Sequence, residues 1–206
     1  EAIAITEDGG IIPTTSVCNS ASFAIFAEKV LVEINTNLSP AFEGLHDIYI
    51  PSYRPTRQAI PLTQVDERIG THAINIDPSK IVGIVINNEY HDSPSTVTEP
   101  DDETQGIANH LINFFEQEVA AGRLPKDLGP LQAGIGSIAN AVLTGLKDSN
   151  FEDLVMYSEV LQDCTFELID AGKMKFASGS AITLSAKYGE IVFNNLDALK
   201  DKVVLR

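Results

Sequence analysis

The sequence predicts an α/β fold in which helices cover parallel sheets. Residues 130–206 alternate between short apolar runs and segments with helical spacing, which is typical of a parallel sheet with helices packed on it. Residues 11–35 have the order strand, helix, strand, which favours a right-handed crossover onto a parallel sheet. A Gly-Ile-Gly turn at 134–136 joins a strand to a helix opening at Ser137, because small residues allow a sharp turn and Ser is a good N-cap.

The first elements along the chain are a hairpin, a helix and a strand. Residues 2–6 and 11–17 are strand-like, and the Glu-Asp-Gly-Gly sequence at 7–10 between them is a strong hairpin signal. Aromatic and apolar residues at helical spacing predict a helix over 20–29. The β-branched run 30–35 then predicts a buried strand.

Residues 38–70 are predicted to form one long ordered loop, because prolines and scattered aromatic residues interrupt any regular periodicity. Such loops in compact domains are usually functional or form interfaces. His46 and Asp47 could act as an acid/base pair, but a histidine held by its neighbours in a structural loop is at least as common. Three arginines in the loop could bind phosphate groups or pair with carboxylates: Arg54, Arg57 and Arg68.

Two strands and a linker complete the first half of the chain. Residues 71–77 and 81–87 are strand-like, and the second run is almost wholly apolar, as expected of a strand covered on both faces. Residues 89–102 are rich in Ser, Thr, Pro and acidic residues, which predicts an interdomain linker. We therefore divide the chain into two domains, 1–98 and 99–206.

The second half begins with an amphipathic helix over 104–121, which ends at Gly122 and Pro125. His110 lies beside the apolar face of this helix and is expected at the surface or half-buried. The alternating pattern then predicts, in order, strand 130–133, helix 137–147, strand 153–158, helix 160–171, strand 174–183, helix 185–201 and strand 203–206.

Composition narrows the class of function. The 206 residues are 44% hydrophobic, enough for a buried core, and the formal net charge of −15 without clustered Lys and Arg argues against a duplex-binding surface. We expect no nucleic-acid partner, and no membrane span because no apolar run approaches about 20 residues. Cys18 and Cys164 are isolated thiols without metal-ligand spacing, so we expect no metal site, a buried inert Cys164 and a reducing cytoplasm.

Glu159 directly follows the predicted strand 153–158, so its carboxylate should lie at the carboxyl end of that strand. Ligands bind at this edge of open α/β sheets, and the turn at 134–136 should offer its backbone N–H groups on the same rim. The turn lacks the third glycine of a dinucleotide fingerprint and the Gly-Lys-Ser/Thr of a P-loop, so we discount a nucleotide-phosphate turn. From the residues alone, a catalytic Glu159 and a merely structural one both stay open.

Five longer motifs carry a family resemblance. The two most specific are Gly-Ile-Gly with Ala-Asn-Ala-Val, within 134–142, and Tyr-Ser-Glu-Val-Leu-Gln-Asp at 157–163. The others are Glu-Gly-Leu-His-Asp-Ile-Tyr at 43–49, Val-Asp-Glu-Arg-Ile-Gly-Thr at 65–71 and Glu-Val-Ala-Ala-Gly-Arg-Leu-Pro at 118–125. Through them nearly the whole chain resembles the acetyl-CoA hydrolase/transferase family. It looks most like succinyl-CoA:acetate and propionyl-CoA:succinate CoA-transferases, and more distantly like 4-hydroxybutyrate CoA-transferases.

The resemblance implies two tandem parallel-sheet α/β domains of the CoA-transferase (NagB/RpiA-like) type, present here as a fragment. It implies that Glu159 is the nucleophile and passes through an acyl-glutamyl anhydride and a glutamyl-CoA thioester. It places oxyanion and CoA-binding N–H donors at Gly134, Ile135 and Gly136, with Ile135 the best match. Coenzyme A is then a substrate and covalent intermediate, with no separate cofactor. The family's linker arginine falls near His91 here, which puts a linker contact with CoA phosphate in doubt.

The resemblance further implies an enzyme that moves CoA between a short-chain acyl-CoA (acetyl-, propionyl- or succinyl-CoA) and a carboxylic acid, as a cytoplasmic homodimer. Acetyl-CoA hydrolysis at the same site differs only in the acceptor, and the sequence does not separate the two. A non-catalytic α/β CoA-binding fragment also stays open, because both ends of the chain fall inside strand-like runs, at 1–6 and 203–206.

Overall fold

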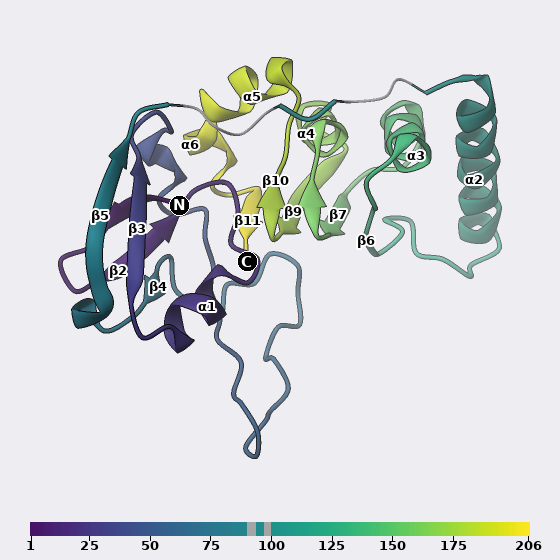
Figure 1. The fold of residues 1–206 in the computed structure, drawn as a ribbon. Helices are drawn as coiled ribbons and strands as arrows, with labels where there is room; N and C mark the ends of the chain where they lie inside the picture. The colour runs from purple at the N-terminus through teal and green to yellow at the C-terminus, as the bar shows by residue number, and fades with distance from the viewer. Residues whose placement is uncertain (90–93, 97–99) are drawn as a thin grey trace.

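The first half of the chain forms a five-stranded mixed sheet with the strand order β4-β2-β1-β3-β5 (Figure 1). The computed structural model describes residues 1–89, 94–96 and 100–206. In this half it places β1 (Ala2–Ile5), β2 (Gly10–Pro13), α1 (Ser20–Phe26), β3 (Val30–Asn35), the 3-10 turns η1 (Pro40–Phe42) and η2 (Pro78–Lys80), β4 (Ile74–Asn75) and β5 (Ile81–Asn87). The predicted hairpin is confirmed, since β1 and β2 pair antiparallel, and β3 lies parallel to both β1 and β5. The crossover between parallel strands predicted over 11–35 is wrong, because β2 is antiparallel to β1 and therefore runs opposite to β3.

The second half contains a four-stranded parallel sheet in the order β11-β9-β7-β6 and a separate pair of short parallel strands, β8 and β10. An α/β fold with parallel sheets is therefore confirmed. The elements are α2 (Asp102–Ala120), β6 (Pro130–Leu131), α3 (Ser137–Asp148), β7 (Leu154–Tyr157), β8 (Val160–Leu161), α4 (Asp163–Asp170), β9 (Met174–Gly179), β10 (Ala181–Ile182), α5 (Ala186–Phe193), α6 (Leu196–Leu199) and β11 (Val203–Leu205).

Three predicted elements are divided in the structure. The helix predicted over 160–171 begins only at Asp163, because residues 160 and 161 form β8 and pair with β10. The strand predicted over 174–183 is interrupted at Ser180, where the chain leaves the pairing with β7 and takes up that with β8. The helix predicted over 185–201 divides into α5 and α6 at residues 194 and 195.

Local signals explain α2, the longest helix described. Asp101 and Thr104 form a capping box in which each side chain accepts a hydrogen bond from the other residue's backbone N–H. The helix ends before Gly122, whose φ of 70° is a left-handed conformation that glycine adopts without strain. α2 packs against α3, and His110 is exposed, as predicted.

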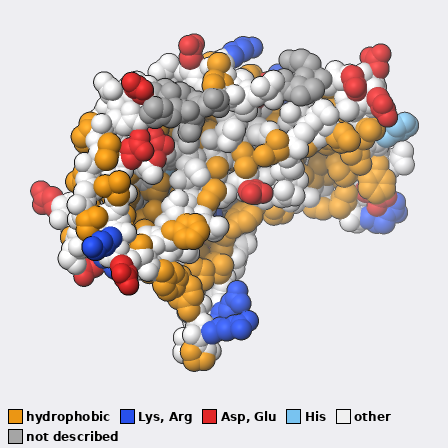
Figure 2. All heavy atoms as spheres, viewed as in Figure 1, with side chains coloured by type: hydrophobic (Ala, Val, Ile, Leu, Met, Phe, Trp, Pro, Cys, Tyr) orange, Lys and Arg blue, Asp and Glu red, His pale blue; other side chains and the backbone are white. Residues whose placement is uncertain are grey.

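The long loop is also confirmed. After η1, residues 43–73 form no helix or strand, and the part around residues 50–64 projects away from both sheets (Figure 1). Basic side chains lie near its tip (Figure 2). One contact that fixes its flank is an edge-on aromatic pair between Phe26 of α1 and Tyr53, whose ring centroids are 4.9 Å apart.

The two halves are joined without sharing a sheet. Residues 15–17 pair with the β10 region through an isolated antiparallel bridge, Ser16 with Ala181, and His46 forms an isolated parallel bridge with Leu205 of β11. A common hydrophobic core extends through both halves and includes Phe42, whose ring centroid lies 5.4 Å from that of Phe193. The strands described before residue 88 and after residue 129 thus form separate sheets, while the division into two domains at 98/99 stays a prediction.

The expectation that both faces of β5 are covered is wrong for this chain. Val82, Ile84, Val85 and Ile86 are between 47% and 66% exposed. Val82, Ile84 and Ile86 alternate onto one face of the sheet, which no described helix covers, and β5 is also an edge strand, paired on one side with β3. An apolar run indicates that a strand requires cover, but it does not indicate which part of a protein supplies it.

We expect the 206-residue polypeptide to self-associate through this exposed strand, because an apolar edge offers unpaired backbone groups to another copy. Sedimentation velocity over a range of concentrations would measure this. Ile86→Lys should weaken the association, whereas Ile60→Lys, at a similarly exposed residue of the long loop, should not. Monomeric behaviour of the unaltered polypeptide at high concentration would contradict the prediction.

Candidate active site

Glu159 lies at the carboxyl end of β7, in the short connection between β7 and β8. Its side chain is exposed, and no hydrogen bond or ion pair of its carboxylate is recorded within the described part of the chain. β7 is an interior strand of the sheet, flanked by β6 and β9. The carboxylate is therefore available to a ligand at the edge of the sheet where parallel strands end.

The Gly134 to Gly136 turn follows β6, which pairs in parallel with β7, so the turn and Glu159 lie at the same edge. The N-cap of α3 is Gly136 rather than Ser137, which is the first helical residue, and no side chain caps this end. Gly136 has a φ of 149°, a conformation that L residues rarely adopt. The N–H groups of the turn have no recorded acceptor among residues 1–89, 94–96 and 100–206.

Side chains on both sides of Glu159 hold the turn. The Ser158 hydroxyl donates to the Ala133 carbonyl at 3.0 Å and accepts from the Ala133 N–H at 3.4 Å. The Gln162 amide donates to the Gly134 carbonyl at 3.4 Å. These bonds fix the predicted nucleophile segment and the predicted oxyanion turn relative to each other.

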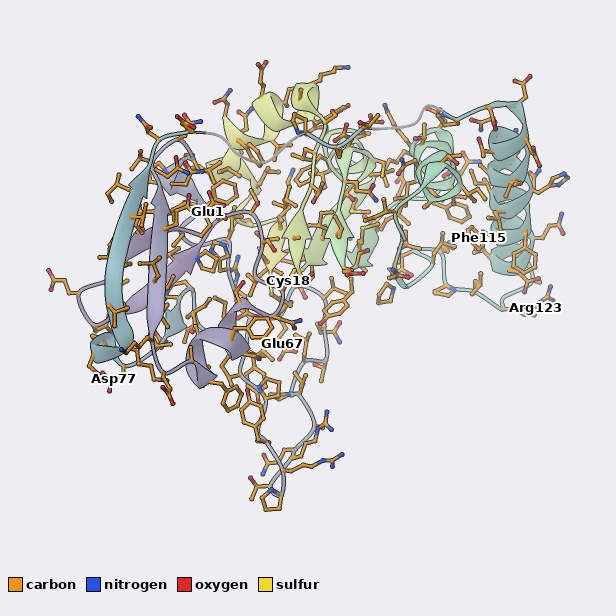
Figure 3. The ribbon with its side chains drawn as sticks, in the orientation of Figure 1. Glu1, Cys18, Glu67, Asp77, Phe115 and Arg123 are labelled. Carbon is orange, nitrogen blue, oxygen red and sulfur yellow. The ribbon has the colours of Figure 1, made fainter. Side chains whose placement is uncertain are left out.

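A groove of about 550 Å³ adjoins the turn. Its walls come from α3, β6 and the turn, and from Phe115 of α2, which points toward α3 in Figure 3. Ile135 is 75% exposed beside this groove. The turn therefore has open space next to it.

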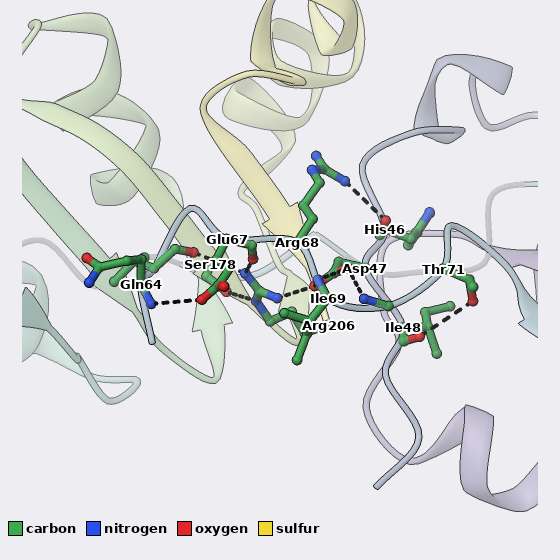
Figure 4. Close-up of polar contacts among 12 residues, drawn as sticks. His46, Asp47, Ile48, Gln64, Glu67, Arg68, Ile69, Thr71, Ser178 and Arg206 are labelled. Carbon is green, nitrogen blue, oxygen red and sulfur yellow. Dashed lines mark hydrogen bonds and ion pairs between the residues drawn. The ribbon is translucent and has the colours of Figure 1, made fainter. Parts of the chain in front are cut away.

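His46 and Asp47 are buried structural residues and are not part of the exposed sheet edge that carries Glu159 and the turn. Their exposed fractions are 1% and 2%. The Asp47 carboxylate accepts from the N–H groups of Ile69 and Gly70 and forms an ion pair with Arg206 (Figure 4). One ring nitrogen of His46, Nε2, lies 2.9 Å from the Thr14 carbonyl, and the buried Nδ1 has no partner in the described structure.

The three loop arginines separate in the structure. Arg68 donates to the carbonyls of His46 and Lys200, so it braces the base of the loop rather than pairing with a carboxylate. Arg54 and Arg57 are exposed in the projecting part, and binding of CoA phosphates by either one stays a prediction. His91, where the resemblance puts the family's linker arginine, lies outside the described residues.

Sequence reasoning missed Arg206 and Ser180. Arg206 pairs with Asp47 across 159 positions, and Ser180 donates to the Glu159 carbonyl across 21. Local sequence patterns do not predict hydrogen-bond partners at such large separations along the chain.

The two thiols differ in environment. Cys164 is buried in α4, and burial raises its pKa to about 11, so the expectation of an inert thiol is supported. Cys18 is exposed. Among the residues described there is no cluster of three or more potential metal ligands, and none of the helices described is long and apolar enough to cross a membrane.

Comparison with known proteins first defines a class. The fold is similar to that of a 4-hydroxybutyrate CoA-transferase from Porphyromonas gingivalis, with a TM-score of 0.58 and 22% identity over 94% of this chain and 43% of that one. It is also similar to RipA from Yersinia pestis, with a TM-score of 0.59 and 18% identity over 92% of this chain and 36% of that one. The architecture is thus that of the CoA-transferase fold.

Sequence comparison tests the family resemblance. Residues 1–86 match the acetyl-CoA hydrolase/transferase N-terminal domain. Over all 206 residues the chain is 46% identical to an acetyl-CoA hydrolase of Schizosaccharomyces pombe and 42% identical to one of Saccharomyces cerevisiae. The predicted resemblance to the acetyl-CoA hydrolase/transferase family is confirmed. It spans 39% of the length of these relatives.

The burial of His46 predicts a pH-dependent stability. Burial lowers its pKa to about 4 in the folded protein, whereas an unfolded histidine titrates near 6.5. Stability from the neutral ring is therefore complete above about pH 6.5 and is lost as the pH falls toward 4, because the unfolded state then binds the proton more tightly. We expect the free energy of unfolding to decrease by about 2 kcal/mol between pH 7 and pH 5.

Urea denaturation at both pH values would measure this difference. His46→Gln should remove most of it, and His110→Gln, at an exposed histidine, should leave it intact. A His46→Gln protein with the same pH dependence as the unaltered one would show that His46 is not the group responsible.

Proposed function

We propose that the protein to which this chain belongs transfers CoA between a short-chain acyl-CoA and a carboxylic acid, with Glu159 as the nucleophile. The observation that carries this proposal is the exposed Glu159 carboxylate on the same sheet edge as the N–H groups of the Gly134 to Gly136 turn, which have no acceptor in the described part of the chain. The family supports the substrate class, since its curated relatives are named acetyl-CoA hydrolases.

In the proposed reaction, a carboxylate oxygen of Glu159 attacks the thioester carbonyl carbon. The carbon–sulfur bond breaks, CoA leaves as thiolate, and a mixed anhydride remains that keeps the activation of the thioester. The thiolate then attacks the side-chain carbonyl carbon of Glu159 in this anhydride. This attack releases the donor acid as carboxylate and forms a glutamyl-CoA thioester. An acceptor carboxylate attacks this thioester and repeats the two steps in reverse.

Each attack creates a tetrahedral intermediate with a negative oxygen. The N–H groups of the turn are the proposed donors to this oxyanion, and Ile135 best matches the family donor. Glutamate is normally ionised at neutral pH, so the scheme needs no general base. It also needs no metal and no cofactor besides CoA as substrate.

Hydrolysis of acetyl-CoA is the second candidate. The exposure of Glu159 favours it, because water then has access to the anhydride or the thioester. Acetyl-CoA consumption measured with and without succinate or propionate would separate the two, since a transferase requires the acid and a hydrolase does not. A non-catalytic CoA-binding role would show neither activity. A homodimer in the cytoplasm remains part of the proposal through the resemblance alone.

Glu159→Ala in the full-length protein should abolish exchange between acyl-CoA and labelled free acid, because the variant lacks the carboxylate on which the proposed anhydride forms. Glu159→Asp should also lower the exchange rate about a hundredfold, since one missing methylene withdraws the carboxylate by about 1 Å. Isotope exchange rates would measure both. A Glu159→Ala enzyme that exchanges at a near-normal rate would rule out the assignment.

Gly136→Val should slow turnover of every acyl-CoA while leaving CoA affinity nearly intact. A φ of 149° is strained for a β-branched residue, so the turn and its N–H groups must move. Loss of one oxyanion donor predicts a decrease in kcat of about 10²–10³-fold. Steady-state kinetics with acetyl-CoA and succinyl-CoA would test this, and an effect on KM alone would contradict it.

A further inference from the structure

The backbone carbonyl of Glu159 accepts three hydrogen bonds. The donors are the backbone N–H of Ser180 at 2.8 Å, the Ser180 hydroxyl at 2.9 Å and the N–H of Ala181 at 3.2 Å. A carbonyl oxygen has two lone pairs, so two N–H donors already satisfy it. The Ser180 hydroxyl is therefore an additional restraint on the peptide plane that follows Glu159.

Ser180 is itself held by the first half of the chain. Its carbonyl accepts from the Val17 N–H at 2.9 Å, and the Ile182 N–H donates to the Thr15 carbonyl at 2.8 Å. These bonds surround the antiparallel bridge between Ser16 and Ala181. Residues 15–17, about 160 positions earlier in the chain, thus hold Ser180 in place at the interruption between β9 and β10.

The hydroxyl of Ser180 has further contacts on the same side. The Cys18 sulfur lies 3.6 Å from the Ser180 hydroxyl and 3.2 Å from that of Ser16. Cys18 has a φ of 42°, and a non-glycine residue stays in that conformation only where its surroundings determine it. Figure 3 shows Cys18 close to the strands of the second half. The support behind Ser180 is therefore built from several ordered side chains.

On its other side, Glu159 follows Ser158, whose hydroxyl is bonded to Ala133 just before the oxyanion turn. The backbone N–H of Ser158 also donates to the Ser178 carbonyl at 2.9 Å. One flank of Glu159 is thus tied to the turn, and its carbonyl is tied to Ser180. The geometry between the carboxylate and the turn depends on both restraints.

We propose that Ser180 is a positioning residue for the nucleophile, and this inference rests on the proposed function of Glu159. Its hydroxyl limits rotation about the backbone of Glu159 and so keeps the carboxylate at the required distance from the oxyanion donors. It does not contact the substrate. Because a displacement of about 1 Å at a reacting group can cost about a hundredfold in rate, a partial loss of this restraint should affect the chemical steps and leave binding intact.

The test compares Ser180→Ala and Ser180→Thr in the full-length protein. Ser180→Ala should lower kcat about tenfold, less than the hundredfold expected for a full displacement of about 1 Å, because the restraint is only partly lost. The KM for acyl-CoA should stay within about twofold of that of the unaltered enzyme. Ser180→Thr keeps the hydroxyl and should recover kcat to within about threefold. Single-turnover experiments with acyl-CoA should show the same decrease, because the restraint acts on the chemical steps.

Ser149→Ala is the matched structural control. The Ser149 hydroxyl donates to the Leu146 carbonyl at 2.7 Å and accepts from the Phe151 N–H, at the C-terminal end of α3, opposite the end that adjoins the Gly134 to Gly136 turn. Its loss should lower thermal stability and leave kcat and KM unchanged. An equal decrease in kcat for Ser149→Ala, or an unchanged kcat for Ser180→Ala, would overturn the inference.

Glu159→Ala, measured in parallel, separates the two levels of the proposal. If Glu159→Ala retains activity, the proposed function fails, whatever the effect at Ser180. If Glu159→Ala is inactive and Ser180→Ala is normal, only the positioning role fails.

Discussion

The guanidinium group of Arg206 joins the two halves of the molecule through a buried ion pair with Asp47. It also donates to the Ser178 hydroxyl at 2.7 Å and to the backbone carbonyls of Val65 and Glu67 (Figure 4). The side chain of Asp47 is 1% exposed, and removal of one partner from such a buried pair typically costs about 3–5 kcal/mol. Arg206 therefore fixes the base of the long loop against β9 and β11.

This network extends to the rim. Ser178, which accepts from Arg206, offers its carbonyl to the N–H of Ser158, and Ser158 immediately precedes Glu159. The hydroxyl of Ser158 then reaches Ala133, the residue before the oxyanion turn. The long loop thus contributes to the candidate site by bracing the strands that carry it, and its buried histidine and aspartate need no catalytic role.

Periodicity and turn chemistry predicted the parts of the fold that depend on local sequence. The hairpin, α2 and the alternation of strands and helices along the second half follow from patterns within about 20 residues. β8 escaped notice because two residues are too few to show a period, and the exposure of β5 depends on sheet order, which the pattern of one strand does not determine. The rim was predicted because both of its segments follow parallel strands, whereas its supports, Ser180 and Arg206, act across long stretches of chain.

If the proposed reaction is right, Glu159 becomes covalently attached to CoA during turnover. Mass spectrometry of the full-length protein after incubation with acetyl-CoA, followed by peptide mapping, would detect this attachment. We expect a CoA-sized adduct on the peptide that contains Glu159. Turnover without any adduct on this peptide, or an adduct on a different acidic residue, would contradict the proposed reaction.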